Sequence, residues 1–255
     1  MKIKSMIGRL VVGITLLMTA GMSAHARKIG GYVDKAEDRF VRNVWNFIRE
    51  YSSNQNVGGQ LWKYSHYYYM QPYMFTTSND SWTDAMDFVY AAGHGNSYLL
   101  QCNKAAGVSF DFSADMPTTN GLGDSNAEYL VIESCLTVQS LAETSDPWTP
   151  WMRTLKGLHQ IVGFHTLSYS DNGIPNNYAR KLKAGLSVWQ AWFQAVNEER
   201  SVLHGSFYPG MASAIFYAGT RNDTLATAGY PDPSGWGGWR GGRDWGSIWN
   251  WYQRE

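Results

Sequence analysis

The chain has 255 residues with 21 Lys+Arg and 21 Asp+Glu, and this even charge balance argues against a nucleic-acid-binding protein. Apolar residues make up 44% of the sequence, enough for one domain of the larger kind to bury a core. The chain contains 12 Trp and 16 Tyr but only 16% charged residues, which indicates extensive aromatic packing. A long exposed aromatic groove is the alternative.

The first 26 residues have the pattern of a secretory signal peptide. An apolar segment over 10–22 precedes a small-x-small cleavage site at Ala24–Ala26, and its basic flank contains Lys2, Lys4 and Arg9. The apolar segment is shorter than the roughly 20 residues that span a bilayer, and no later stretch approaches that length. We therefore expect an exported bacterial protein, periplasmic or secreted, whose mature chain over 27–255 is a single domain with no integral membrane segment.

The N-terminal part of the mature chain predicts a strand, a helix and a longer aromatic segment. Ile29–Val33 indicates a short edge strand, and Asp34 is a suitable N-cap for a helix over 36–51. That helix is supported by apolar residues at helical spacing: Phe40, Val41, Val44, Trp45, Phe47, Ile48 and Tyr51. The stretch over 54–81 is rich in Gly, Asn and Tyr, and we expect a strand or long loop that lies over the core.

Two short apolar runs each end in a reactive side chain. Phe88–Ala92 leads into Gly-His-Gly-Asn with His94 at its centre, and Tyr129–Ile132 leads into Glu-Ser-Cys with Cys135 at its end. Such runs are typical of strands buried on both faces, although periodicity alone also allows a buried helix. If the two strands are parallel neighbours, His94 and Cys135 lie together at the carboxyl edge of one sheet, where open α/β folds bind ligands.

The chain between and just after these runs predicts surface elements and connecting helices. Apolar and polar residues alternate over 108–113 as in a small surface strand. Beyond Cys135, residues 136–142 favour a helix whose first N–H groups would stabilise a thiolate. A second helix is expected from Trp148 to Leu155, bracketed by prolines.

The C-terminal half completes an alternation of strands and helices. Ile161–Phe164 predicts a third buried strand ending in His165, 175–200 the longest helix, and Met211–Tyr217 a further strand. The tail from Gly229 on is rich in Gly and Trp without a fixed period. The alternation predicts an α/β fold, a three-layer α/β/α sandwich with a mainly parallel central sheet.

The two reactive runs carry a resemblance to a known family. A strand ending in His94-Gly95, followed 41 residues later by one ending in Ser134-Cys135, resembles the caspase-like, clan CD cysteine peptidases, which include legumain, clostripain, gingipain and separase. Ile132-Glu133-Ser134-Cys135 is similar to the legumain version. Together with Gly163–Thr166, these motifs resemble more closely an uncharacterised family of bacterial proteins with the same fold, and the similarity covers about Asp87–Asp171.

This resemblance implies a caspase-like fold and a set of roles. Cys135 would be the nucleophile and His94 its base, because a thiol is only slightly ionised at neutral pH. The backbone N–H groups of Gly95 and Cys135 would form the oxyanion hole, and glycine at position 95 allows close approach of a substrate. The sequence contains no identifiable acid or base for a primary specificity pocket.

Four further residues are candidates for substrate binding: Asn96, Glu133, His165 and Asp171. His165 and Asp171 follow the third strand and should share the edge with the nucleophile, where they would line the substrate pocket or orient His94. The alternative is a hydrogen-bonded loop histidine and a turn carboxylate.

The only cysteines are Cys102 and Cys135, and in an exported protein two cysteines also suggest a disulfide. Such a bond would silence the nucleophile until it is reduced. A zinc site built from His94, His165 and Cys135 lacks a close-spaced ligand pair, so we expect no metal and no cofactor. A serine hydrolase is disfavoured because no Gly-x-Ser-x-Gly occurs.

The function that we expect is that of an exported, monomeric cysteine hydrolase, an endopeptidase acting on peptides or proteins through an acyl-enzyme. The alternative is a non-catalytic envelope protein of the same fold that binds peptides or glycans through its Trp and Tyr surface. A transpeptidase is a third possibility, because the same acyl-enzyme allows transfer.

Overall fold

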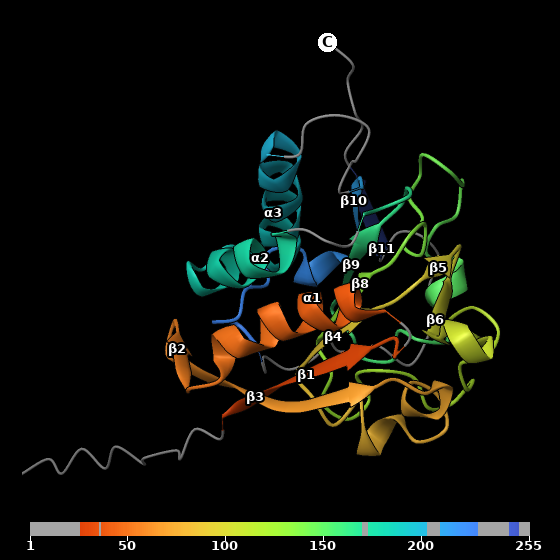
Figure 1. Ribbon diagram of the computed structural model, residues 1–255, viewed down its shortest axis with the longest axis horizontal. Coiled ribbons are helices and arrows are strands. Elements are labelled where there is room, and N and C mark those ends of the chain that lie inside the picture. Colours follow the sequence, from red (N-terminus) through yellow and green to blue (C-terminus); the bar gives the residue numbers. More distant parts are fainter. Residues whose placement is uncertain (1–25, 36, 170–172, 203–209, 229–244, 250–255) are drawn as a thin grey trace, which may run out of the picture.

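The computed structural model describes residues 26–35, 37–169, 173–202, 210–228 and 245–249, and its centre is an eight-stranded sheet (Figure 1). The strand order is β11-β10-β9-β8-β4-β1-β3-β2. The strands are β1 (Arg27–Val33), β2 (Gln55–Val57), β3 (Gln60–Tyr69), β4 (Phe88–Ala92), β8 (Tyr129–Glu133), β9 (Gln160–Phe164), β10 (Ala212–Tyr217) and β11 (Trp245–Trp249).

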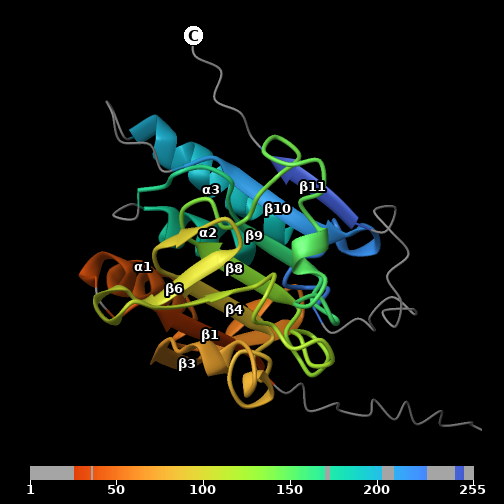
Figure 2. The same ribbon diagram turned by 90° about the vertical axis from the view of Figure 1, so that its right-hand side faces the viewer.

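The five strands at the centre of this sheet are parallel. β3 pairs with β1, β1 with β4, β4 with β8 and β8 with β9, all in parallel, whereas β2, β10 and β11 join antiparallel at the two sides. Figure 2 shows β11, β10, β9, β8, β4, β1 and β3 side by side in this order. The predicted α/β fold with a mainly parallel central sheet is confirmed.

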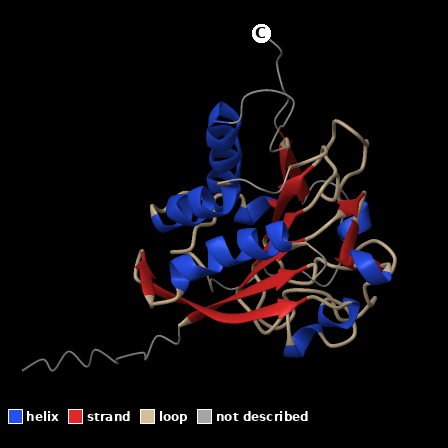
Figure 3. Cartoon of the chain, in the orientation of Figure 1, coloured by secondary structure: helices blue, strands red, loops and turns tan. Residues whose placement is uncertain are grey.

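Helices cover one face of the sheet and a different kind of layer covers the other (Figure 3). The helices α1 (Asp38–Ile48), α2 (Ile174–Lys183) and α3 (Val188–Val202) pack on the first face. On the second face lie 3-10 turns, loops and a small antiparallel sheet of β5 (Gly95–Asn96), β6 (Leu99–Asn103) and β7 (Val108–Asp111). The three layers were predicted, but within the described residues the second outer layer has no α-helix.

The strand over 27–33 is interior, not at the edge as predicted. β1 lies between β3 and β4, with Val33 paired to Tyr69 on one side and to Ala92 on the other. Ile29, Tyr32 and Val33 are completely buried, as an interior strand requires. The first described strand is therefore interior, with β3 paired on one side and β4, which comes after β3 in the chain, on the other. Residues that follow β1 and β4 meet at this topological switch point.

The two helices predicted between Cys135 and the third strand are not formed. The N–H of Leu136 donates to the carbonyl of Thr166 at 2.9 Å, and the N–H of Val138 donates to that of Phe164 at 3.1 Å. These bonds hold the chain against β9, and Leu136 has a φ of +58°, outside the range of a right-handed helix. Farther on, only a short 3-10 turn over Thr149–Trp151 forms, where prolines interrupt the pattern.

The predicted helix over 36–51 is present as α1, with a 3-10 turn continuing to Tyr51. Its apolar side buries Phe40, Val44, Phe47 and Ile48. The long helix predicted over 175–200 is divided into α2 and α3 by Gly185, which has a φ of +86° and ends the first helix. The predicted signal peptide and most of the Trp-rich tail lie outside the described residues.

Candidate active site

His94 and Cys135 follow neighbouring parallel strands at the same edge of the sheet. β4 pairs with β8 so that Ala92 lies opposite Glu133, and each candidate residue comes two positions after its paired strand end. The two loops also touch, because a Cβ at Gly95 would collide with Ser134 Oγ and lie 2.5 Å from Thr137 Oγ1. Only glycine fits at position 95. The sequence prediction that these strands are parallel neighbours is confirmed.

Cys135 lies at a sharp turn directly after its strand. The next residue, Leu136, has a φ of +58°, a left-handed conformation that is costly for a branched side chain. The turn is held by the hydrogen bond from the Leu136 N–H to Thr166. Cys135 itself is half-buried, and within the described part of the chain its backbone N–H has no hydrogen-bond acceptor. An N–H of this kind is available to a substrate oxygen.

The sulfur of Cys135 contacts a residue that the sequence did not indicate. The backbone N–H of Ser168 points at Sγ from 3.3 Å, and the thiol is 3.4 Å from the Ser168 carbonyl and 3.7 Å from its hydroxyl oxygen. Sγ therefore accepts a hydrogen bond from the Ser168 N–H and donates one to the Ser168 carbonyl, so the loop after β9 holds the thiol in place.

The predicted disulfide between Cys102 and Cys135 is not formed, because both cysteines are free. Cys102 lies on β6 with its side chain completely buried among the apolar residues of the second face. Burial, with a smaller contribution from the charge of Asp34, raises the pKa of the Cys102 thiol to about 12. Cys102 is therefore a core residue, and Cys135 is the accessible thiol.

His94 is hydrogen-bonded to the carboxylate of Glu37, the residue directly before α1. Its Nε2 is hydrogen-bonded to Glu37 Oε1, and its ring packs edge-on against Phe40 at 5.1 Å between centroids. Lys104 Nζ lies 2.9 Å from the same Glu37 oxygen and 3.1 Å from Nε2. The side chain of His94 is 26% exposed, so the imidazole is held on one side and open to solvent on another.

Glu37 is strongly biased toward its charged form. Burial opposes ionisation, but hydrogen bonds from His94 and Lys104 and the nearby positive charges lower the pKa of the Glu37 carboxyl to about 2. An ionised Glu37 favours a proton on Nε2 of His94, which would leave Nδ1 as the basic nitrogen. Among the described residues no hydrogen bond joins His94 to Cys135, so the structure shows a shared edge and not a formed dyad.

Glu133 is not at a substrate surface, contrary to the prediction. It is 1% exposed and faces the helical layer, where it accepts hydrogen bonds from Asn43 Nδ2 at 2.5 Å and from the Tyr90 hydroxyl at 2.8 Å. Residues alternate between the two faces of a strand, and position 133 falls on the face covered by α1.

His165 is also too buried to contact a substrate. Its side chain has no exposed surface, and its Nδ1 lies 2.7 Å from Glu143 Oε1, so the alternative of a hydrogen-bonded loop histidine describes it. Asn96 is exposed on β5, and its Oδ1 accepts a hydrogen bond from the Ser97 N–H. Asn96 remains a candidate for substrate binding. Asp171 lies outside the described residues.

Glu37, Lys104 and Ser168 are the residues that the sequence did not single out. Glu37 lies in the helix predicted over 36–51, and no sequence pattern places it beside His94. Once β1 is known to adjoin β4, the residues after both strands must share the switch point, and Glu37 becomes an obvious neighbour of His94. Lys104 and Ser168 follow other elements, and no sequence pattern links them to this edge.

One group of carboxylates has the spacing of metal ligands. Asp80, Asp84 and Asp124 place ligand oxygens within 4.8 Å of one another, away from the residues discussed above. Asp84 already accepts backbone N–H groups from Gly123 at 2.8 Å and Ala127 at 2.7 Å. These bonds give Asp84 a structural role in shaping the loop that leads into β8.

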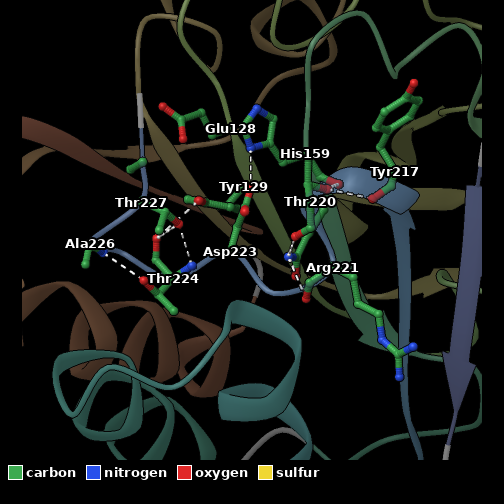
Figure 4. A network of polar contacts seen from close by, with 12 residues as sticks. Glu128, Tyr129, His159, Tyr217, Thr220, Arg221, Asp223, Thr224, Ala226 and Thr227 are labelled. Carbon is green, nitrogen blue, oxygen red and sulfur yellow. Dashed lines mark hydrogen bonds and ion pairs between the residues drawn. The ribbon is translucent and has the colours of Figure 1, made fainter. Parts of the chain in front are cut away.

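A further histidine–carboxylate pair, drawn in Figure 4, lies at the amino edge of the sheet, where the parallel strands begin. His159 lies directly before β9, and its Nδ1 is 2.7 Å from Asp223 Oδ2. The His159 side chain is 3% exposed. The Thr220 hydroxyl donates to the His159 carbonyl at 2.8 Å. This network attaches the segment after β10 to the start of the central strands.

Comparison with protein families assigns the chain to one of them. The family model described as "Domain of unknown function (DUF6345)" matches residues 15–234. The chain belongs to the DUF6345 family. A search of curated proteins finds no match.

A solved structure similar to this DUF6345 protein is that of a secreted C11 cysteine protease from Bacteroides thetaiotaomicron in complex with an irreversible peptide inhibitor. The TM-score is 0.46 and the sequence identity 9%, and the match covers 75% of this chain. It covers 66% of the protease chain, just under two thirds. In the described parts of the DUF6345 protein, no helix is long and apolar enough to cross a membrane.

Proposed function

We propose that this DUF6345 protein is an exported cysteine hydrolase, an endopeptidase that uses Cys135 as nucleophile and His94 as general base and acid. The observation that carries the proposal is the parallel pairing of β4 with β8, which puts both residues two positions beyond opposed strand ends. Both side chains are partly exposed, which agrees with access to substrate. Export rests on the signal-like first 26 residues.

The first chemical step would form an acyl-enzyme. The Cys135 thiolate attacks the carbonyl carbon of a peptide bond, and a C–S bond forms as the carbonyl oxygen becomes an oxyanion. The N–H of Cys135, which has no acceptor among the described residues, and the N–H of Gly95 are the donors proposed for this oxygen. The C–N bond then breaks, and His94 gives its proton to the leaving amine.

The second step would return the enzyme to its starting state. Water loses a proton to His94 and attacks the thioester, the C–S bond breaks, and the carboxylic acid product leaves the Cys135 thiolate. The lack of a direct hydrogen bond between His94 and Cys135 is compatible with these steps, because catalytic contacts often form only with substrate bound. Glu37 would act as a positioning residue that holds the His94 ring and its proton on Nε2.

Thiol labelling tests this proposal. Iodoacetamide at pH 6 should modify Cys135 of the native protein rapidly, and His94→Ala should remove the excess rate. His66→Ala is the matched control, because His66 is partly exposed on β3 and its ring contacts the nearby Ser65 and Tyr68. A rate no faster than that of a free thiol in a peptide would contradict the proposal.

Cleavage of a peptide library then identifies the substrate. Products that vanish in Cys135→Ala would establish an endopeptidase. Tight binding of library peptides without cleavage would instead favour the non-catalytic envelope protein, which would use its aromatic surface. Exposed aromatic side chains around β3 and α1 support that second reading: Trp45 is 47%, Tyr69 46% and Tyr73 43% exposed.

A further inference from the structure

The carboxylate of Glu133 links β8, the strand that leads to Cys135, to α1, the helix that begins directly after Glu37. Glu133 ends β8, two residues before Cys135, and accepts a hydrogen bond from Asn43 in the middle of α1. Its second oxygen accepts the Tyr90 hydroxyl from β4. We propose that Glu133 and Asn43 are positioning residues that set the register of α1 over the catalytic edge.

Helix α1 reaches His94 at two points, which is why its register matters. Glu37, the residue at its N-cap, bonds Nε2, and Phe40 in its first turn packs against the imidazole ring. A small slide or rotation of α1 would move both contacts together. Catalytic rates are sensitive to shifts of about 1 Å, which can cost about 100-fold.

The apolar packing of α1 does not fix its register alone. Phe40, Val44, Phe47 and Ile48 make contacts that are strong but non-directional, so they oppose separation of the helix more than sliding. A hydrogen bond to a buried carboxylate is directional, and losing a donor to such a carboxylate is costly. The Asn43–Glu133 bond is therefore suited to selecting one position of α1 relative to β8.

Two variants separate this role from general support of the fold. Asn43→Ala removes the Asn43–Glu133 hydrogen bond between α1 and β8, whereas Tyr90→Phe removes a different hydrogen bond to the same carboxylate and leaves the Asn43–Glu133 bond intact. We expect Asn43→Ala to slow labelling of Cys135 at pH 6 about tenfold or more and Tyr90→Phe to leave the rate within about twofold, on the sensitivity of catalysis to displacement. Equal losses in the two variants would overturn the proposal. Asn43→Ser replaces Asn43→Ala if the latter does not fold.

A double-variant cycle tests whether Asn43 acts through Glu37. If it does, Glu37→Ala combined with Asn43→Ala should lose clearly less than the sum of the two single losses, because only the Phe40 contact is then left for Asn43→Ala to disturb. Additive losses would show that Asn43 supports the site by another route and would refute the positioning role.

The labelling test of this inference rests on the proposed function. A second measurement therefore distinguishes failure of the positioning role from failure of the proposed function. The ¹⁵N resonance of His94 Nε2 reports whether this nitrogen carries the proton that bonds Glu37. We expect this signal to change in Asn43→Ala and to persist in Tyr90→Phe. If native Cys135 labels slowly, the proposed function fails, but a selective change of the His94 signal would still support the positioning role. An unchanged signal would contradict it.

Discussion

The two edges of the central sheet carry similar side chains in different settings. At the carboxyl edge His94 bonds Glu37, and at the amino edge His159 bonds Asp223. His94 is 26% exposed and lies beside the loop of an accessible thiol, whereas His159 is 3% exposed and belongs to a network that holds loops together. A histidine–carboxylate pair is therefore not evidence of catalysis in itself. Exposure and a neighbouring nucleophile distinguish the carboxyl edge.

The sharpest test of exposure compares the two thiols. Burial raises the pKa of Cys102 to about 12, from an ordinary thiol value of 9, so its thiolate fraction should be about 1,000-fold lower at neutral pH. Mass spectrometry after brief alkylation of the native protein should find modification at Cys135 alone. Unfolding in urea should make Cys102 react as well. Rapid modification of Cys102 in the folded protein would remove this distinction.

Replacing His94 and His159 in turn tests whether only the histidine at the carboxyl edge affects the reactivity of Cys135. His94→Ala should slow alkylation of Cys135 at pH 6 by about 100-fold, the lower range for loss of a general base. His159→Ala should leave the rate of folded molecules unchanged, because His159 lies at the opposite edge. Rates should be measured well below the unfolding temperature of each variant. A similar loss in both would mean that the two edges are coupled.

The same two replacements should affect the free energy of unfolding in the reverse order. His159→Ala leaves Asp223 without its histidine partner and removes a buried ring, which should lower the free energy of unfolding by about 2 kcal/mol. His94 is partly exposed, so His94→Ala should cost less than about 1 kcal/mol. Urea denaturation followed by tryptophan fluorescence measures both. A larger loss for His94→Ala would assign it a structural role.

Glu37 gives the smallest expected effect, a pH dependence of stability. Its pKa is about 2 in the folded protein and 4.5 ordinarily, so its contribution is present above pH 4.5 and is lost as the pH falls toward 2. Solvent screening limits that contribution to about 1 kcal/mol. Unfolding curves at pH 6 and pH 3 should therefore differ less for Glu37→Gln than for the unchanged protein. Parallel losses in the two proteins would contradict the assignment.

Much of the fold followed from local pattern. The runs over 88–92, 129–132 and 161–164 are apolar throughout because parallel strands are buried on both faces, and each forms a strand of the sheet. The helix near 36–51 followed from the spacing of its apolar residues. The helices predicted after Cys135 failed, because bonds from Leu136 and Val138 to the chain around β9 override local propensity.

The candidate site likewise combines features that could be predicted from the sequence with features that could not. Gly95 and the strand-end positions of His94 and Cys135 could be predicted, because parallel strands bring their carboxyl ends to one edge. The environment of each side chain could not. Glu133 and His165 have the right positions in the sequence, but strand alternation and loop packing bury them.

The sequence by itself determined an α/β chain with two buried strands that present a histidine and a cysteine to one edge. This was possible because burial on both faces leaves a local signature in the order of residues. Only the tertiary structure decided that β1 is interior, that Glu37 bonds His94 and that Cys102 is a separate buried thiol. Those facts depend on which strands are neighbours and which face each side chain takes, and they arise from contacts between residues far apart in the chain.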